Sequence, residues 1–252
     1  MGTCRKVCPL FCRLNSFFYR TPIVVNINTG AFYDCHAKYI RLPNHLRFIQ
    51  DYAFHYCCLL TTLEFTNDIS EIDFGEIDDI VGGCNYVDEI IVPLQYLSNY
   101  IDDPEDRFFP FFLYEQLKSK IVLSDYNKMI WADVNFKVSG GATPFYCTSL
   151  NGTSAYINTN VNVVPANRVV CLSGENGKIV YLTATTSSAD NISTPSDIVK
   201  VYNGTYISNS SGNYYHYYNG GIEFPTIPTP VYFESNTAYL RNTSYSTIEI
   251  QQ

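Results

Sequence analysis

The 252-residue sequence predicts a mainly β fold with short helical turns, in which a solenoid of repeats precedes a β-sandwich or small-barrel domain. Two observations lead to this fold class. An apolar pattern recurs from residue 31 to about residue 130, and Asn, Ser, Thr and Tyr become dominant after residue 138. We therefore divide the chain into an N-terminal arm and capping strand (1–30), a repeat array (31–134) and a β-rich domain (135–252).

The N-terminal arm ends in an apolar segment, residues 23–27, with the sequence IVVNI. Its β-branched residues favour a β-strand. The turn-forming triplet Asn28-Thr29-Gly30 follows it directly. Its position before the first repeat predicts that this strand caps the solenoid.

The repeat pattern begins with Ala-Phe-x-x-Cys and continues with apolar residues at regular offsets. The first unit starts at residues 31–35 (AFYDC) and the second at residues 53–57 (AFHYC). A third, less regular unit surrounds Cys84, and a degenerate fourth runs through residues 112–123. Self-similarity at a period of roughly 20–50 residues is typical of solenoids, because one repeat cannot bury its apolar face alone.

This pattern resembles the BspA-like leucine-rich repeat, whose consensus is roughly Ala-Phe-x-x-Cys-x-x-Leu-x-x-Ile-x-Ile-Pro-x-x-Val-x-x-Ile. The second unit matches it nearly throughout, with Thr66 in place of the proline, and the third matches from Cys84 to Pro93. The resemblance implies a leucine-rich-repeat solenoid. It also implies the adhesin or receptor-like role of many proteins with this repeat.

Each unit contains a short segment in which side chains alternate between the core and the solvent, as in a half-buried strand. The predicted inward residues are Ile40, Leu42, Leu63, Phe65, Ile90 and Val92. The predicted outward residues are Tyr39, Arg41, Thr62, Glu64, Glu89 and Ile91. Solenoids usually bind partners on this strand face, so the outward six are candidate partner-binding residues. The alternative is an ordinary solvated surface.

The β-rich domain contains two Asn-Gly dipeptides, at residues 176–177 and 203–204, each between two strand-like segments. Because Asn-Gly supplies the positive φ angles of a tight turn, we expect β-hairpins at 169–182 and 198–207. The tyrosine-rich run at residues 214–218 is a candidate glycan or contact patch formed by Tyr214, Tyr215, Tyr217 and Tyr218. The alternative is an aromatic strand that pairs with its neighbours.

No catalytic or metal-binding constellation assembles from the motifs. His36 and His55 adjoin the repeat cysteines Cys35 and Cys57, but the repeat pattern makes those thiols buried packing positions. Nine cysteines occur without a C-x-x-C spacing, and no phosphate-binding loop, H-E-x-x-H or G-x-S-x-G motif is present. We therefore expect a non-enzymatic protein that has no catalytic residues, no metal site and no cofactor.

The charge and hydropathy patterns limit the partners further. The net charge of −8 argues against nucleic acid, which requires a concentrated basic face. No run of 18 or more apolar residues occurs, so no transmembrane segment is expected, and the N-terminus does not match a secretory signal. The partners expected are other proteins of a virion or a surface, with a homo-oligomer as one form.

Low charge and a Tyr-, Asn- and Thr-rich β half favour a virion component, such as a bacteriophage head-decoration, fibre or tail protein. Its protein–protein contacts would then be made through the repeat face. The alternatives are a cell-surface or extracellular adhesin or receptor-like module, and a glycan-binding protein that uses its C-terminal domain.

Overall fold

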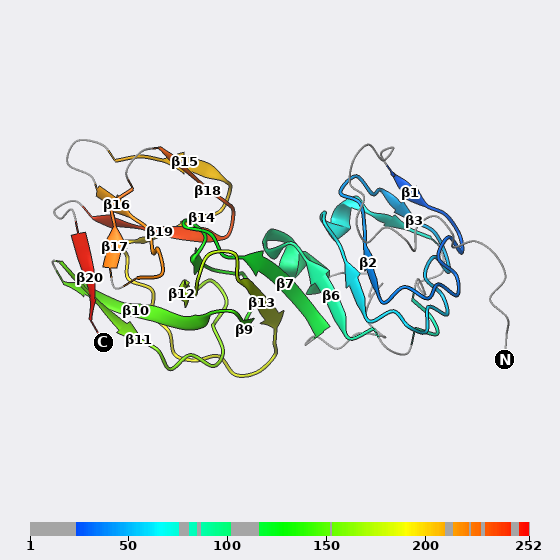
Figure 1. Ribbon diagram of the computed structural model, residues 1–252, viewed down its shortest axis with the longest axis horizontal. Helices are drawn as coiled ribbons and strands as arrows, with labels where there is room; N and C mark the ends of the chain where they lie inside the picture. Colours follow the sequence, from blue (N-terminus) through cyan, green and yellow to red (C-terminus); the bar gives the residue numbers. More distant parts are fainter. Residues whose placement is uncertain are drawn as a thin grey trace. The chain divides into compact units, whose positions relative to one another are not determined.

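A computed structural model describes residues 24–75, 81–84, 87–101, 116–151, 153–209, 214–221, 223–227, 230–242 and 247–251. The chain divides into two compact units, Met1–Lys118 and Ser119–Gln252, here called the N-terminal and C-terminal units (Figure 1). Residues 1–23 of the predicted arm lie outside the described residues. The division at residues 30 and 134 stays a prediction.

Two sets of parallel strands run through the N-terminal unit. The first set contains β2 (Tyr39–Arg41), β4 (Thr62–Glu64) and β6 (Glu89–Val92), in which β4 pairs in parallel with both neighbours. The second set is a three-stranded parallel sheet of β1 (Asn26–Ile27), β3 (Phe48–Ile49) and β5 (Asp73–Phe74). The predicted strand at 23–27 is thus confirmed at Asn26–Ile27, where it belongs to the second sheet.

Short helical turns follow the strands of the second and third repeats. They are the 3-10 helices η1 (Ile69–Glu71) and η2 (Leu94–Tyr96) and the helix α1 (Leu97–Ile101). Asp68 caps η1 by accepting a hydrogen bond from the backbone N–H of Ser70 at 3.0 Å. From α1, the Tyr100 hydroxyl donates to the Asn67 carbonyl at 2.9 Å, which ties the two repeats together.

The predicted core positions of the repeats are confirmed. All six inward residues (Ile40, Leu42, Leu63, Phe65, Ile90 and Val92) are at most 8 % exposed. The Ala-Phe pair of the second unit is fully buried, and the Phe32 and Phe54 rings stack with centroids 5.1 Å apart. Each repeat therefore completes the apolar core of its neighbour, which is why a single unit would not be stable.

The turn before each repeat cysteine adopts a left-handed backbone. The residues there are Asp34 (φ 56°), Tyr56 (φ 60°) and Gly83 (φ 71°). Successive turns are joined by backbone hydrogen bonds, such as those from Asp34 N–H to the His55 carbonyl (2.9 Å) and from Tyr56 N–H to the Gly82 carbonyl (2.7 Å). Because residues with a Cβ adopt this conformation only at a cost, these bonds between repeats must stabilise it at Asp34 and Tyr56.

The C-terminal unit is built almost entirely of strands. One nine-stranded sheet has the order β14-β19-β8-β12-β10-β11-β20-β17, with β16 pairing with β19. Strands β7, β13 and β9 are neighbours in that order. Strand β15 pairs with β18. The bounds are β7 Leu117–Val122, β8 Met129–Ile130, β9 Phe136–Gly140, β10 Thr143–Asn151, β11 Ser154–Asn158, β12 Val170–Ser173, β13 Ile179–Ala184, β14 Ile198–Val201, β15 Thr205–Ile207, β16 Tyr214–His216, β17 Glu223–Pro225, β18 Val231–Phe233, β19 Thr237–Asn242 and β20 Thr247–Gln251. The mainly β fold is confirmed; a sandwich or barrel in this unit stays a prediction.

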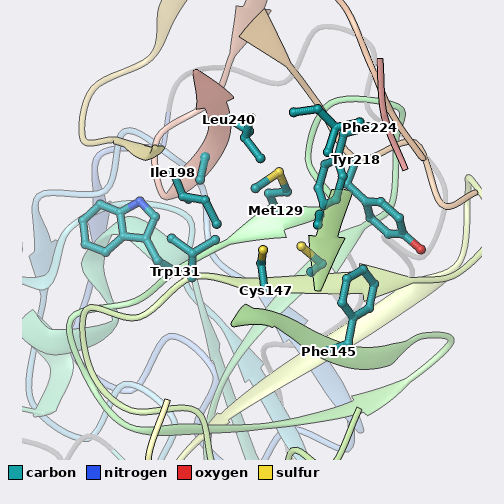
Figure 2. Close-up of a cluster of buried hydrophobic side chains, with 13 residues drawn as sticks. Met129, Trp131, Phe145, Cys147, Ile198, Tyr218, Phe224 and Leu240 are labelled. Carbon is teal, nitrogen blue, oxygen red and sulfur yellow. The ribbon is translucent and has the colours of Figure 1, made fainter. Parts of the chain in front are cut away.

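One apolar cluster of this unit gathers side chains from many of these strands (Figure 2). Its labelled members are Met129, Trp131, Phe145, Cys147, Ile198, Tyr218, Phe224 and Leu240. The Trp131 indole N–H donates to the Thr237 carbonyl at 3.1 Å, which satisfies the one polar atom of that buried ring. Residues far apart in sequence therefore share one core.

The two hairpins predicted at Asn-Gly dipeptides are wrong, although their strands are present. Strand β12 lies between β8 and β10, so both of its edges are occupied and β13 pairs with β9 instead. Likewise, β14 pairs with β19 and β15 with β18. Of the four residues in the two Asn-Gly dipeptides, only Gly177 has the expected positive φ, 81°, and the chain changes partner strands at both turns. A true hairpin joins β10 to β11, where Asn151 opposes Ser154.

Gly83→Ala is expected to destabilise the N-terminal unit more than Gly30→Ala. Both glycines are left-handed, so each substitution should cost about 1 kcal/mol of backbone strain. A Cβ at Gly83 would overlap the Tyr56 ring, whereas at Gly30 it would meet only Tyr33 Cβ at 3.6 Å. Urea unfolding followed by far-ultraviolet circular dichroism measures the difference, and Tyr56→Ala should restore part of the loss in the Gly83 variant. Equal losses in the two single variants would contradict the packing argument.

Candidate functional site

The pairing register brings the six candidate partner-binding residues together on one face. Tyr39, Thr62 and Glu89 form one row across β2, β4 and β6, and Arg41, Glu64 and Ile91 form the next. Residues two apart on a strand project to the same side, so the two rows share a face. This surface is called the strand face below.

Glu64 differs from the expectation, because it is only 8 % exposed and its carboxylate is engaged within the protein. Its Oε2 accepts a hydrogen bond from the Tyr39 hydroxyl, and its Oε1 lies 3.1 Å from Arg41 Nε. A buried carboxylate is tolerated only when it is paired and hydrogen-bonded in this way. The predicted contact role of Glu64 is therefore corrected: it holds two neighbours that are themselves exposed, Tyr39 at 42 % and the Arg41 side chain at 52 %.

Glu89 is the second carboxylate of the strand face, and it too has partners within the chain. Lys118 Nζ, at the start of β7, lies 2.7 Å from Glu89 Oε1, and the Thr62 hydroxyl donates to Oε2 at 3.4 Å. Sequence reasoning missed Lys118. The available signal was its place beside the apolar residue Leu117, because alternation in a half-buried strand turns the next side chain away from the core.

Ile91 was predicted to point to solvent, but it is only 5 % exposed. Strand β6 buries three successive side chains, Ile90, Ile91 and Val92. Burial on both sides is the pattern of a strand that is covered on both faces, where alternation no longer separates core from solvent. The accessible strand face therefore consists of Tyr39 and Arg41, with Thr62, Glu89 and Lys118 half-buried beside them.

A second exposed surface, which the sequence analysis did not predict, lies on the turns of the first two repeats. Tyr33, Tyr52 and Tyr56 are 53 %, 37 % and 51 % exposed, and their rings surround His55. The His55 ring centroid lies 4.2 Å from Tyr56, 5.1 Å from Tyr52 and 5.8 Å from Tyr33. The signal in the sequence was the aromatic residue at the variable positions of Ala-Phe-x-x-Cys in both units.

The tyrosine run at 214–218 is distributed between core and surface. Strand β16 pairs with β19, and Tyr218 is 3 % exposed, with its ring 4.9 Å from Phe145 and 5.7 Å from Phe224. Tyr218 is therefore a core residue and not part of a contact patch. Tyr215 and Tyr217 are half-buried against Tyr239 and Tyr126, and the side chain of Tyr214 lies outside the described side chains.

The thiols of Cys35 and Cys57 occupy buried packing positions, as predicted, whereas Cys84 in the third repeat is half-buried. Cys35 and Cys57 are at most 1 % exposed, and the Cys57 thiol donates to the Phe32 carbonyl at 2.9 Å. The hydrogen bond with the Cys84 thiol, together with burial, raises the pKa of Cys57 far above its usual value. The reactive thiolate is thus not formed at physiological pH.

Among the described residues, no group of three or more His, Cys, Asp or Glu side chains could hold a metal ion. In the same part of the chain, no helix is both long and apolar enough to cross a membrane. The site that remains is a surface with fixed polar contacts and exposed rings.

Residues 11–99 match the family model described as a BspA type leucine rich repeat region, with six copies. This stretch is a BspA-type leucine-rich-repeat region. The match begins within the segment predicted as an arm and ends before β7. No curated protein and no solved structure matches the chain. The BspA-type repeats indicate a protein-interaction module.

Thiol labelling should separate two adjacent cysteines. Cys58 is exposed, whereas Cys57 is fully buried with a raised pKa, so native protein treated with N-ethylmaleimide should react at Cys58 and about tenfold or more slowly at Cys57. Fragment mass spectrometry resolves the two positions, and labelling in urea provides the control in which both react. Similar native rates would show that the repeat turn opens readily.

A double-mutant cycle should distinguish the Arg41–Glu64 pair from a fully surface pair. We expect a coupling free energy of about 1 kcal/mol for Arg41→Gln with Glu64→Gln, because Glu64 is largely removed from water. The matched control is Arg47–Glu71, which is 2.8 Å long but has both side chains 49 % exposed, so its coupling should stay below about 0.5 kcal/mol. Denaturant unfolding of the single and double variants gives both values; a weaker coupling at Glu64 would contradict its supporting role.

Proposed function

We propose that this chain is a non-enzymatic module that binds another protein through the strand face of its BspA-type repeats. The observation that supports this is that two exposed side chains, Tyr39 and Arg41, are both held by contacts with the buried carboxylate of Glu64. Tyr and Arg are enriched among the residues that dominate binding energies at protein interfaces. They are more effective when already fixed, because less side-chain entropy is lost on association.

The chemistry of the described thiols and carboxylates supports a binding role rather than catalysis. The Cys57 thiol is kept protonated by its neighbours and by burial. Glu64 and Glu89, the two carboxylates of the strand face, are both matched by cations at 3.1 Å and 2.7 Å. Carboxylates paired in this way position the side chains that they contact.

We propose that the module acts on a surface, as a cell-surface or extracellular adhesin or receptor-like component. The BspA-type repeats support this location. The alternative location, a virion as a bacteriophage head-decoration, fibre or tail protein, rests on the low charge and the Tyr-, Asn- and Thr-rich C-terminal half. Both locations require the same protein-binding face.

A photo-crosslinking experiment tests the binding face. p-Benzoylphenylalanine at position 39 should crosslink to a specific partner protein in intact cells or particles of the natural source. The matched control places it at position 48, because Phe48 on β3 is as exposed (44 %) as Tyr39 (42 %) but belongs to the other sheet. Mass spectrometry identifies the products.

Equal crosslinking at both positions, or crosslinking only at position 48, would refute binding through the strand face. The identity of the partner separates the two locations. A capsid or tail protein would assign the chain to a virion, and a host or matrix protein would assign it to a cell surface.

A further inference from the structure

We infer that Glu64 is a positioning residue, and that the partner meets Arg41 with a carboxylate while an apolar side chain packs on the ring of Tyr39. This inference rests on the proposed function and specifies the chemistry of the partner. It follows from the geometry of three side chains on two adjacent strands, β2 and β4.

Glu64 organises its neighbours without contacting a partner. Both of its oxygens are occupied, Oε2 by the Tyr39 hydroxyl and Oε1 by Arg41 Nε at 3.1 Å, and the residue is only 8 % exposed. One buried carboxylate therefore fixes two different side chains at the same time. Replacing Glu64 with Gln would keep both neighbours in the sequence but remove the charge that attracts Arg41 and one of the two acceptor oxygens.

Arg41 keeps most of its donors for a partner. A guanidinium has five N–H donors, and the pair with Glu64 uses the one on Nε. The four N–H groups on the two terminal nitrogens belong to a side chain that is 52 % exposed. These nitrogens form a planar fork that matches a carboxylate in a bidentate geometry.

The exposed charge at this end of the face is the guanidinium of Arg41. Its partner Glu64 balances that charge but is only 8 % exposed, so the basic group is the one that faces solvent. The whole chain has a net charge of −8. At the other end of the face, Lys118 and Glu89 neutralise each other at 2.7 Å. A basic spot on an acidic protein orients an approaching acidic group.

The spacing of the two exposed side chains limits the shape of the partner segment. Tyr39 and Arg41 are two residues apart on β2, which places them about 7 Å apart on one face. An extended peptide has the same repeat between its own alternate side chains. The matching segment therefore has an Asp or Glu two positions from an aromatic or aliphatic residue.

Selection from a phage-displayed random dodecapeptide library against the immobilised full chain tests this inference. Enriched peptides should contain the acid and the apolar residue two positions apart. For a synthesised peptide, Arg41→Gln should weaken binding about tenfold to a hundredfold, as expected for a residue that dominates an interface. The affinity for wild type should fall as salt is added, and this dependence should shrink in Arg41→Gln.

Two further variants separate positioning from direct contact. Tyr39→Phe keeps the ring and removes the hydroxyl that donates a hydrogen bond to Glu64. Glu64→Gln removes the charge that holds Arg41. Each variant should weaken peptide binding severalfold. Arg47→Gln is the matched control. Arg47 forms a surface pair with Glu71 at 2.8 Å, the counterpart of the 3.1 Å pair between Arg41 and Glu64, so this variant should leave peptide binding unchanged. Circular dichroism melts confirm that each variant is folded, and Tyr39→Phe serves where Glu64→Gln does not fold.

The outcomes distinguish this inference from the proposed function. The inference alone would be overturned by peptides that lack an acidic residue and lose binding with Tyr39→Ala, while their affinity is unchanged by salt and by Arg41→Gln. Peptides whose binding is unaffected by both Tyr39→Ala and Arg41→Gln would count against the strand face itself. A selection that enriches no peptide would overturn recognition of a short acidic segment.

Discussion

The register between successive repeats is the constraint on which the N-terminal unit depends. Backbone hydrogen bonds join each left-handed turn to the next, as from Asp34 to His55 and from Tyr56 to Gly82. They align Tyr39 with Thr62 and Arg41 with Glu64 on the paired strands. A slip of one residue would turn these side chains into the core and the apolar ones out to solvent. Both the buried core and the Glu64 contacts therefore depend on turns that lie away from the strand face.

The sequence pattern was sufficient to predict the repeat core and the composition of the strand face, because both follow from local alternation. It was not sufficient to predict which of those residues are accessible. Glu64 is covered because a tyrosine and an arginine from the neighbouring strand engage it, and Ile91 because β6 is buried on both sides. Such effects depend on side chains from other repeats, which the spacing within one repeat does not describe.

The C-terminal unit shows the same limit for strand pairing and for aromatic runs. Its strands were recognisable from Asn-Gly turns and β-branched residues, but β12 already has partners on both edges, so the adjacent turn cannot form a hairpin. Within the run at 214–218, Tyr218 enters the core while Tyr215 does not. Which strands pair, and which side chains are buried, depends on the strand edges and the core space that the other strands occupy.

The unequal lengths of the repeats have a consequence for how such a protein can diversify. Tyr39 and Thr62 are 23 positions apart and Thr62 and Glu89 are 27 apart, yet all three are aligned in one row. The additional residues lie between the pairing segments, where they leave the alignment unchanged. Chain length and surface chemistry are therefore separable traits. Insertions can accumulate between the pairing segments, while substitutions at a few row positions change the ligand. A lineage, or a protein engineer, can alter either trait without first repairing the other.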